Sequence, residues 1–279
     1  MDGVLLIDKP AGMSSHDVVA AVRRALGGVR TGHAGTLDPF ATGLLLVLVG
    51  RATKAQSVFM GLPKRYHTVA RLGAVSSTGD TEGQITITGR VPADPPRLPT
   101  GEVRQRPPTH SAIKLGGERA YRRARRGEQL VMPERVVTVH RFEQLWREAP
   151  AGPGGEPPAG ARAADAREHA AVAGELPRAA FAIECGSGTY VRSLIADLGD
   201  GYCLELRRTA IGPFDVRDAI APPPPRTAGG AAAAASAGGP PWAEPPLIAL
   251  ADALARVGPA GRARAGEPGD ERARAARRQ

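Results

Sequence analysis

The chain has 279 residues, of which 42% are hydrophobic, enough for one large domain or for a domain with a smaller companion. Lys and Arg (37) exceed Asp and Glu (28), and the net charge of +9 favours an anionic partner such as nucleic acid, although a GC-rich genome also enriches Arg. Two cysteines exclude the usual Cys-rich zinc site, and the absence of a signal peptide or a run of about 18 apolar residues predicts a cytoplasmic protein without a membrane span.

The first 50 residues alternate between apolar segments and turns. Residues 4–7 predict a short buried strand, which Lys9-Pro10-Ala11-Gly12 ends. Ser14 and Ser15 are candidate caps of a helix with one apolar face, and Gly27-Gly28 ends that helix. A loop over 31–39 then precedes a very apolar stretch at 44–49.

The middle of the chain predicts strands and two short helices. Strands are expected from alternating or apolar patterns at 66–72, 85–91, 136–146 and 179–185. A helix is expected over 119–126, and another after the turn Gly186-Ser187-Gly188, capped by Thr189. Helices mixed with irregularly spaced strands indicate an α+β fold with a mainly antiparallel sheet flanked by helices and loops.

Composition divides the chain into a large domain and less regular segments. Residues 1–220 form the expected main domain, and 149–178 within it are predicted to be a flexible low-complexity insertion. The Pro/Ala/Gly run 221–246 reads as a linker. Residues 247–257 carry a short helical pattern, and the Arg-rich end beyond them is expected to be disordered.

The loop around Asp38 is the most informative stretch for function. Two glycines, His33, Thr36 and Asp38 lie between structured segments, where binding and catalytic residues are common. Read locally, Asp38 would more often cap a helix with Pro39 at its first position. His33 alone would more often be a structural histidine.

Several segments in order resemble one family, the TruB family of tRNA pseudouridine synthases. The resemblance begins at Gly3–Asp17 and is strongest at Gly32-His33-Ala34-Gly35-Thr36-Leu37-Asp38-Pro39 with its continuation to Lys54. Further similar segments follow in the family's order: Lys64-Arg65-Tyr66, Pro107-Pro108 with Ser111–Lys114, Gly188–Leu194, Leu206-Arg207-Arg208 and Gly212-Pro213-Phe214. Order and spacing over most of residues 3–215 make coincidence a poor explanation.

The resemblance implies a pseudouridine-synthase fold and Asp38 as the essential catalytic carboxylate. The implied reaction isomerises uridine 55 in the T arm of tRNA, breaking the bond from ribose C1′ to N1 and remaking it to C5. Substrate and product are isomers, so no cofactor and no metal are expected. Asp38 could attack C1′ or C6, or remove a sugar proton, and the sequence does not choose among these routes.

The resemblance also assigns residues around the target base. Arg192 is implied as the ion-pair partner that keeps Asp38 charged, against the alternative of a surface arginine in a helix. Tyr66 is implied to stack on the flipped base, with Tyr190 as its companion and Leu206 as an apolar wall. Tyr66 could instead be an ordinary strand aromatic.

Basic residues are candidate contacts to the tRNA T-arm stem-loop. His33 is implied to stack or hydrogen-bond against RNA. Arginines at helical spacing, with Lys114, form the candidate phosphate-contacting face, although a solvated helix face is equally expected: Arg119, Arg122, Arg123 and Arg126. Lys9 and Lys54 are further candidates.

Three departures from the family pattern bear on these assignments. His110 stands where the family usually has Tyr, and the stretch from Leu198 to Leu206 is shorter than usual, which weakens the assignment of Leu206. Family members often end in an RNA-binding domain of the PUA type, so 247–279 are read as a truncated or degenerate remnant of it.

Three other readings remain open at this point. A guide-RNA-dependent synthase would share the core but is expected to carry a complete PUA domain and protein-binding extensions. An RNA-binding protein that folds tRNA without catalysis, or a catalytically impaired paralogue, would keep the fold. The pattern requires no protein partner and is compatible with a monomer.

Overall fold

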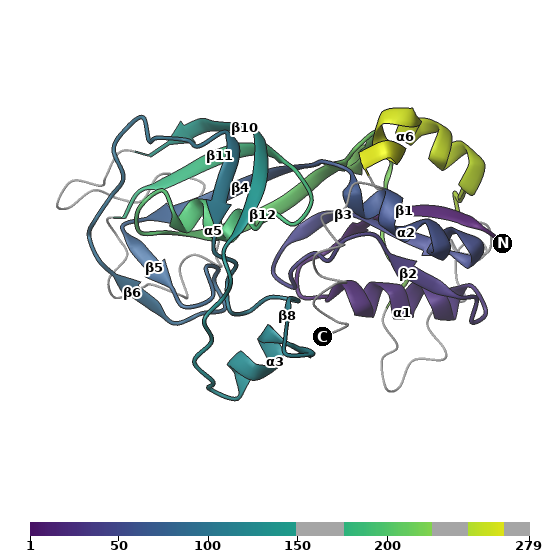
Figure 1. The fold of residues 1–279 in the computed structure, drawn as a ribbon, viewed down its shortest axis with the longest axis horizontal. Helices are drawn as coiled ribbons and strands as arrows, with labels where there is room; N and C mark the ends of the chain where they lie inside the picture. Colours follow the sequence, from purple (N-terminus) through teal and green to yellow (C-terminus); the bar gives the residue numbers. More distant parts are fainter. Residues whose placement is uncertain (149–175, 225–244, 265–279) are drawn as a thin grey trace, which may run out of the picture. The chain divides into compact units, whose positions relative to one another are not determined.

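A computed structural model describes residues 1–148, 176–224 and 245–264 (Figure 1). The insertion predicted at 149–178 and the linker predicted at 221–246 therefore lie mostly outside the described residues. The chain forms two compact units: unit 1 comprises Met1–Arg65 with Arg207–Gln279, and unit 2 comprises Tyr66–Leu206. No described helix is long and apolar enough to cross a membrane.

Unit 1 is built on a sheet in the order β14-β1-β3-β12. Its strands are β1 (Gly3–Lys9), β2 (Thr31–His33), β3 (Thr42–Val49), the end of β12 (Gly201–Ile211), β13 (Phe214–Asp215) and β14 (Ile248–Ala249). Its helices are α1 (Ser15–Ala25), α2 (Gln56–Gly61), α6 (Leu250–Arg264) and the 3₁₀ segments η1 (Gly50–Ala55) and η2 (Val216–Asp218). β1 and β3 run antiparallel from Gly3 opposite Val49 to Lys9 opposite Gly43, whereas β3 and β12 pair in parallel.

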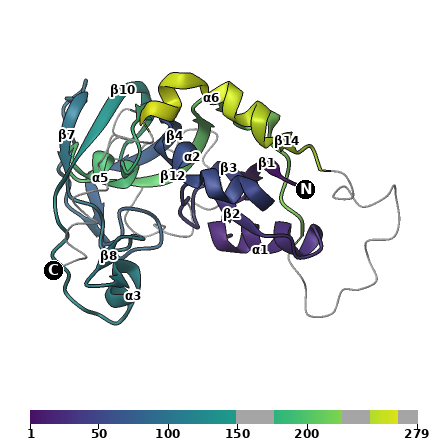
Figure 2. The same ribbon diagram turned by 45° about the vertical axis from the view of Figure 1, so that its right-hand side comes forward.

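Both faces of the β1–β3 pair are buried, which explains why these strands are almost wholly apolar. Val18 and Val22 of α1 cover one face by packing on Leu5, Ile7 and neighbours in β3. The other face is covered by α2 and α6, whose residues Phe59 and Ala253 belong to one cluster. In both views α6 lies on the side opposite α1 (Figures 1 and 2). The sequence predicted β1 and α1 because their hydrophobic patterns are local, whereas α2 was not predicted.

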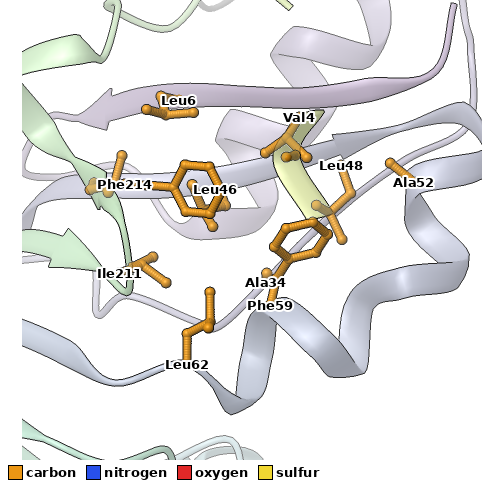
Figure 3. Packing of buried hydrophobic residues seen from close by; sticks show 12 residues of the cluster. Val4, Leu6, Ala34, Leu46, Leu48, Ala52, Phe59, Leu62, Ile211 and Phe214 are labelled. Atoms are coloured by element: carbon orange, nitrogen blue, oxygen red, sulfur yellow. The ribbon is translucent and has the colours of Figure 1, made fainter. Parts of the chain in front are cut away.

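The second core of unit 1 is centred on two phenylalanines (Figure 3). Phe59 of α2 and Phe214 of β13 have ring centroids 6.1 Å apart, and Leu46 of β3 and Ile211 of β12 lie in the same cluster. Ile248, Ala253 and Leu254 pack against it. Residues 248–257 therefore contribute to the core of unit 1, and the interpretation of 247–279 as a remnant of an RNA-binding domain stays a prediction.

The strands of unit 2 are ordered β12-β4-β11-β10-β7. Its main strands are β4 (Lys64–Leu72), β7 (Gly101–Gln105), β10 (Arg135–Arg147) and β11 (Arg178–Cys185). Two small hairpins pair β5 (Ala74–Ser76) with β6 (Ile85–Ile87) and β8 (Lys114–Leu115) with β9 (Glu118–Arg119). Its helices are short: α3 (Ala120–Arg125) and α5 (Val191–Ala196). The expectation of a mainly antiparallel α+β fold is confirmed.

Some local predictions needed correction. The strand expected at 85–91 is only Ile85–Ile87, and the loop expected at 31–39 begins with β2. Thr189 does not cap α5: its hydroxyl donates to the carbonyl of Gly186 at 3.0 Å, and Tyr190 is the N-cap residue. The helix predicted over 119–126 is Ala120–Arg125, so Arg119 lies just before it.

Candidate active site

Asp38 lies in a loop between β2 and β3, not at the start of a helix. Thr42 begins β3 four residues after Asp38, and the Asp38 carbonyl accepts a hydrogen bond from the Ala41 N–H at 3.2 Å. The alternative that Asp38 caps a helix is therefore wrong. Asp38 is half-buried in unit 1.

Ser15 anchors the residue before Asp38. Its buried hydroxyl donates to the Leu37 carbonyl at 3.0 Å and accepts from the Leu37 N–H at 2.9 Å. Ser15 is the first residue of α1, and Ser14 before it caps that helix in a reciprocal pair with Asp17. Hydrogen bonds from the Ser14 hydroxyl and then its N–H lower the pKa of Asp17. This contribution to stability is present at neutral pH and is lost as pH falls through the lowered pKa.

Two buried cations, Lys9 and Arg208, donate hydrogen bonds to carbonyl groups in and around the same loop. The Nζ of Lys9, which is 0% exposed, donates to the carbonyl oxygens of Pro10 (2.8 Å), Met13 (2.7 Å) and Pro39 (3.1 Å). Arg208, which is 1% exposed, donates to those of Leu44 (2.7 Å), Gly35 (3.2 Å) and Thr36 (3.3 Å). The prediction that Lys9 reaches RNA phosphates is therefore corrected, since a fully buried ammonium is not available to a phosphate.

Gly43 allows Arg208 to approach the loop this closely. Its φ is +104°, and an added Cβ would lie 2.2 Å from the carbonyl oxygen of Arg208. Only glycine accommodates both constraints, because other residues rarely adopt this φ and would collide with the backbone of β12. The parallel pairing of β3 with β12 thus brings the guanidinium of Arg208 to residues 35 and 36.

In unit 2, Arg192 lies at the start of α5 in a buried ion pair. Its Nη1 is 3.1 Å from Oδ2 of Asp80, and the two side chains are only 3% and 5% exposed. The same guanidinium donates to the carbonyls of Thr78 at 2.6 Å and His110 at 3.0 Å. The alternative of a surface arginine is wrong.

Asp80 was not anticipated from the sequence. It belongs to the polar turn 76–83, whose Ser, Thr, Gly and Asp residues are typical of any turn. Its other carboxylate oxygen accepts from the Thr78 hydroxyl and from the Glu82 N–H at 3.0 Å. Because the turn also bonds to Cys203 of β12, Asp80 is fixed by contacts that no local pattern reveals.

The three residues predicted to hold the base lie in unit 2. Tyr66 is buried on β4, Leu206 is buried on β12, and β12 neighbours β4 in the sheet. Tyr190 is half-buried, and its backbone is held by the buried side chain of Gln105, which accepts from its N–H at 2.8 Å and donates to its carbonyl at 2.9 Å. The Arg135 guanidinium lies 5.8 Å from the Tyr190 ring centroid.

The predicted phosphate face on α3 is partly neutralised. Arg123 forms an ion pair with Glu128 at 2.6 Å, and Arg126 pairs with Glu118 and Glu128. The hydrogen bond from Arg123 and, next in size, the one from Arg126 lower the pKa of Glu128. Lys114, Arg122 and Lys54 on η1 are exposed and Arg119 is half-buried; their contact with RNA stays a prediction.

His33, the other predicted RNA contact in unit 1, ends β2 directly before the loop. Its ring lies edge-on to that of His16, with centroids 5.6 Å apart, and its carbonyl accepts from the Gln56 side chain at 2.7 Å. Across the described residues, no group of three or more His, Cys, Asp or Glu side chains is arranged to hold a metal ion.

The fold is similar to that of known proteins. A chain in the crystal structure of a Cbf5-Nop10-Gar1 complex is similar in fold, with a TM-score of 0.50 and 28% identity over 76% of this chain. The match covers 50% of that chain, so this protein spans about half its length.

Two curated relatives are more similar in sequence. Both are called tRNA pseudouridine synthase B: one from Thermobifida fusca (43% identical, 78% of this chain, 72% of the relative) and one from Mycobacterium tuberculosis (42%, 78% and 69%). Residues 23–191 match the N-terminal domain of the TruB family of pseudouridylate synthases. The chain belongs to this family.

Proposed function

We propose that this protein is a tRNA pseudouridine synthase that isomerises uridine 55 in the T arm, with Asp38 as its catalytic carboxylate. Family membership and the names of the relatives support the substrate and the reaction. The observation that carries the assignment of Asp38 is the construction of its loop. Ser15, Lys9 and Arg208 hold the loop backbone on both sides of Asp38 by hydrogen bonds to Leu37, Pro39 and Gly35, and Asp38 itself is half-buried.

The chemistry requires an ionised carboxylate beside the target ribose. The C1′–N1 bond breaks, a C1′–C5 bond forms, the hydrogen on C5 leaves as a proton and the freed N1 takes up a proton, so that substrate and product are isomers. Lys9 and Arg208 bring two buried positive charges against the loop, which favours an ionised group there. We assign Arg192 the role of counter-charge to Asp38 on the family resemblance, with Asp80 holding its guanidinium.

Tyr66, Tyr190 and Leu206 are proposed to enclose the flipped base. A uridine stacked in folded RNA hides C1′, so it has to leave the stack, and an aromatic face then holds it. His33, Lys54, Lys114, Arg119 and Arg122 are proposed to contact the surrounding RNA. We further propose that the protein acts in the cytoplasm as a monomer without a guide RNA.

The position of the modified nucleotide and the independence from a guide RNA are tested together on an unmodified tRNA transcript. The purified protein alone is incubated with the transcript, and pseudouridine is mapped by carbodiimide labelling and primer extension. A single new stop, directly 3′ of the modified base and so assigning pseudouridine to position 55, is expected. A stop elsewhere would refute the site, and binding without any stop would favour a tRNA-folding protein, an impaired paralogue or dependence on a guide.

Ser15→Ala tests whether the loop anchor matters for catalysis. The change leaves the buried N–H and carbonyl of Leu37 without their shared partner, at a cost of about 1–3 kcal/mol in unfolding free energy. We expect the single-turnover rate to fall at least about tenfold, because the Asp38 backbone loses its fixed position. The measurement pairs urea unfolding with the rate at saturating tRNA.

Ser14→Ala is the matched control for this prediction. It removes the cap of the same helix and costs about 1 kcal/mol, but it does not touch the loop. Its single-turnover rate should equal that of the wild type. Equal rates for both serine variants would show that the anchor has no catalytic role.

A further inference from the structure

A groove lies on unit 1 between α1 and β2. It has a volume of about 440 Å³, within the range typical of ligand pockets. Val19 and Ala20 give it apolar walls, His16 and Thr31 line it with polar groups, and Arg23 and Arg24 stand at its rim. None of these residues belongs to the catalytic machinery proposed above.

The two rim arginines differ from four other arginines of unit 1. Arg51, Arg65, Arg207 and Arg217 form ion pairs with Asp2, Asp215 or Asp8. Within the described residues, neither Arg23 nor Arg24 has a carboxylate partner, and both are exposed. Two unneutralised guanidinium groups at the edge of an apolar groove suit a phosphate attached to a ring that enters the groove.

The polar lining supports the same ligand. Thr31, the first residue of β2, closes the groove on the side of the sheet. The exposed His16 ring supplies a stacking surface, and its edge contact with His33 makes the groove continuous with β2, which leads into the Asp38 loop.

We infer that this groove binds one unstacked nucleotide of the RNA substrate, other than the target uridine, with its base between Val19, Ala20 and His16 and its phosphate at Arg23 and Arg24. The inference rests on the proposed function for the identity of the RNA. The site would add affinity for the RNA without taking part in the chemistry.

Two variants separate the phosphate contact from base insertion. R23Q/R24Q removes the rim charges, and A20W fills the groove from an exposed helix position while leaving every charge in place. The controls are R141Q/R217Q, which removes two exposed arginines that already pair with Glu143 and Asp215, and A25W, which places tryptophan at an exposed position of α1 outside the groove.

The experiment measures dissociation constants of full-length protein for an unmodified tRNA transcript over a series of KCl concentrations. R23Q/R24Q is expected to weaken binding and to reduce the log–log salt slope by about 1.4–1.8, as for two lost phosphate contacts. A20W is expected to weaken binding about tenfold, as for one lost stacked base, without changing the slope. The controls should stay within about twofold of the wild type.

Three results would overturn the inference: no effect of R23Q/R24Q, equal weakening by the controls, or an A20W protein that binds as tightly as the wild type. Pseudouridine yield from saturating tRNA is recorded for each protein in the same preparation. Wild-type protein that binds tRNA but forms no pseudouridine would refute the proposed function, while the affinities would still decide whether the groove binds RNA.

Discussion

Asp38→Asn is expected to abolish pseudouridine formation while tRNA binding stays within about threefold of the wild type. Asparagine has nearly the same shape but carries no charge, so it can neither attack carbon nor accept a sugar proton effectively. Removing a group of this kind should lower the single-turnover rate by at least about a thousandfold. The rate is measured with enzyme in excess over tRNA, and the affinity by filter binding.

Asp218→Asn is the matched control for this change. Asp218 is exposed in η2 of the same unit, so its replacement alters net charge equally without touching the loop. Its rate should equal that of the wild type. Pseudouridine formation that survives in Asp38→Asn would remove Asp38 from the mechanism.

Breaking the Arg192–Asp80 pair is expected to produce the largest loss of stability. Arg192→Met leaves the Asp80 carboxylate buried without its counter-charge, which typically costs about 3–5 kcal/mol in unfolding free energy. The same change removes the proposed counter-charge of Asp38, so activity should fall beyond what instability explains. Urea unfolding reports the loss of stability. The single-turnover rate, measured at urea concentrations below the unfolding transition, reports the loss of activity.

A double variant distinguishes structure from catalysis at this pair. Arg192→Met with Asp80→Leu replaces both charges by apolar groups, and it should recover much of the lost stability because no unpaired charge remains. It should not recover activity, because Met cannot act as a cation. Recovery of both would show that Arg192 only supports the fold, and wild-type stability of Arg192→Met alone would contradict the importance of the pair.

The sequence predicted elements whose pattern is local. β1, α1 and β10 have hydrophobic periodicities or capping residues that can be read within a few positions. β12 was missed, although it is eleven residues long, because Arg207 and Arg208 interrupt its apolar pattern. Arg208 is nevertheless buried, since carbonyl groups from residues far away in sequence accept its hydrogen bonds.

The candidate site shows the same limit. Asp38 and Arg192 were found through the family resemblance, and the structure adds what surrounds each of them. Ser15 meets Leu37 across 22 positions, and Asp80 meets Arg192 across 112, so neither contact leaves a local signal. Lys9 was misjudged for a related reason: a lysine in a turn is usually exposed, and here three carbonyl oxygens surround it.

Tritium release from tRNA labelled at C5 of uridine is the most direct test of the central claim. Forming the C1′–C5 bond expels the hydrogen on C5, so each conversion releases one label to water. The wild-type protein alone should release one equivalent per tRNA, and Asp38→Asn none. No release by the wild type, or equal release by both proteins, would contradict the account.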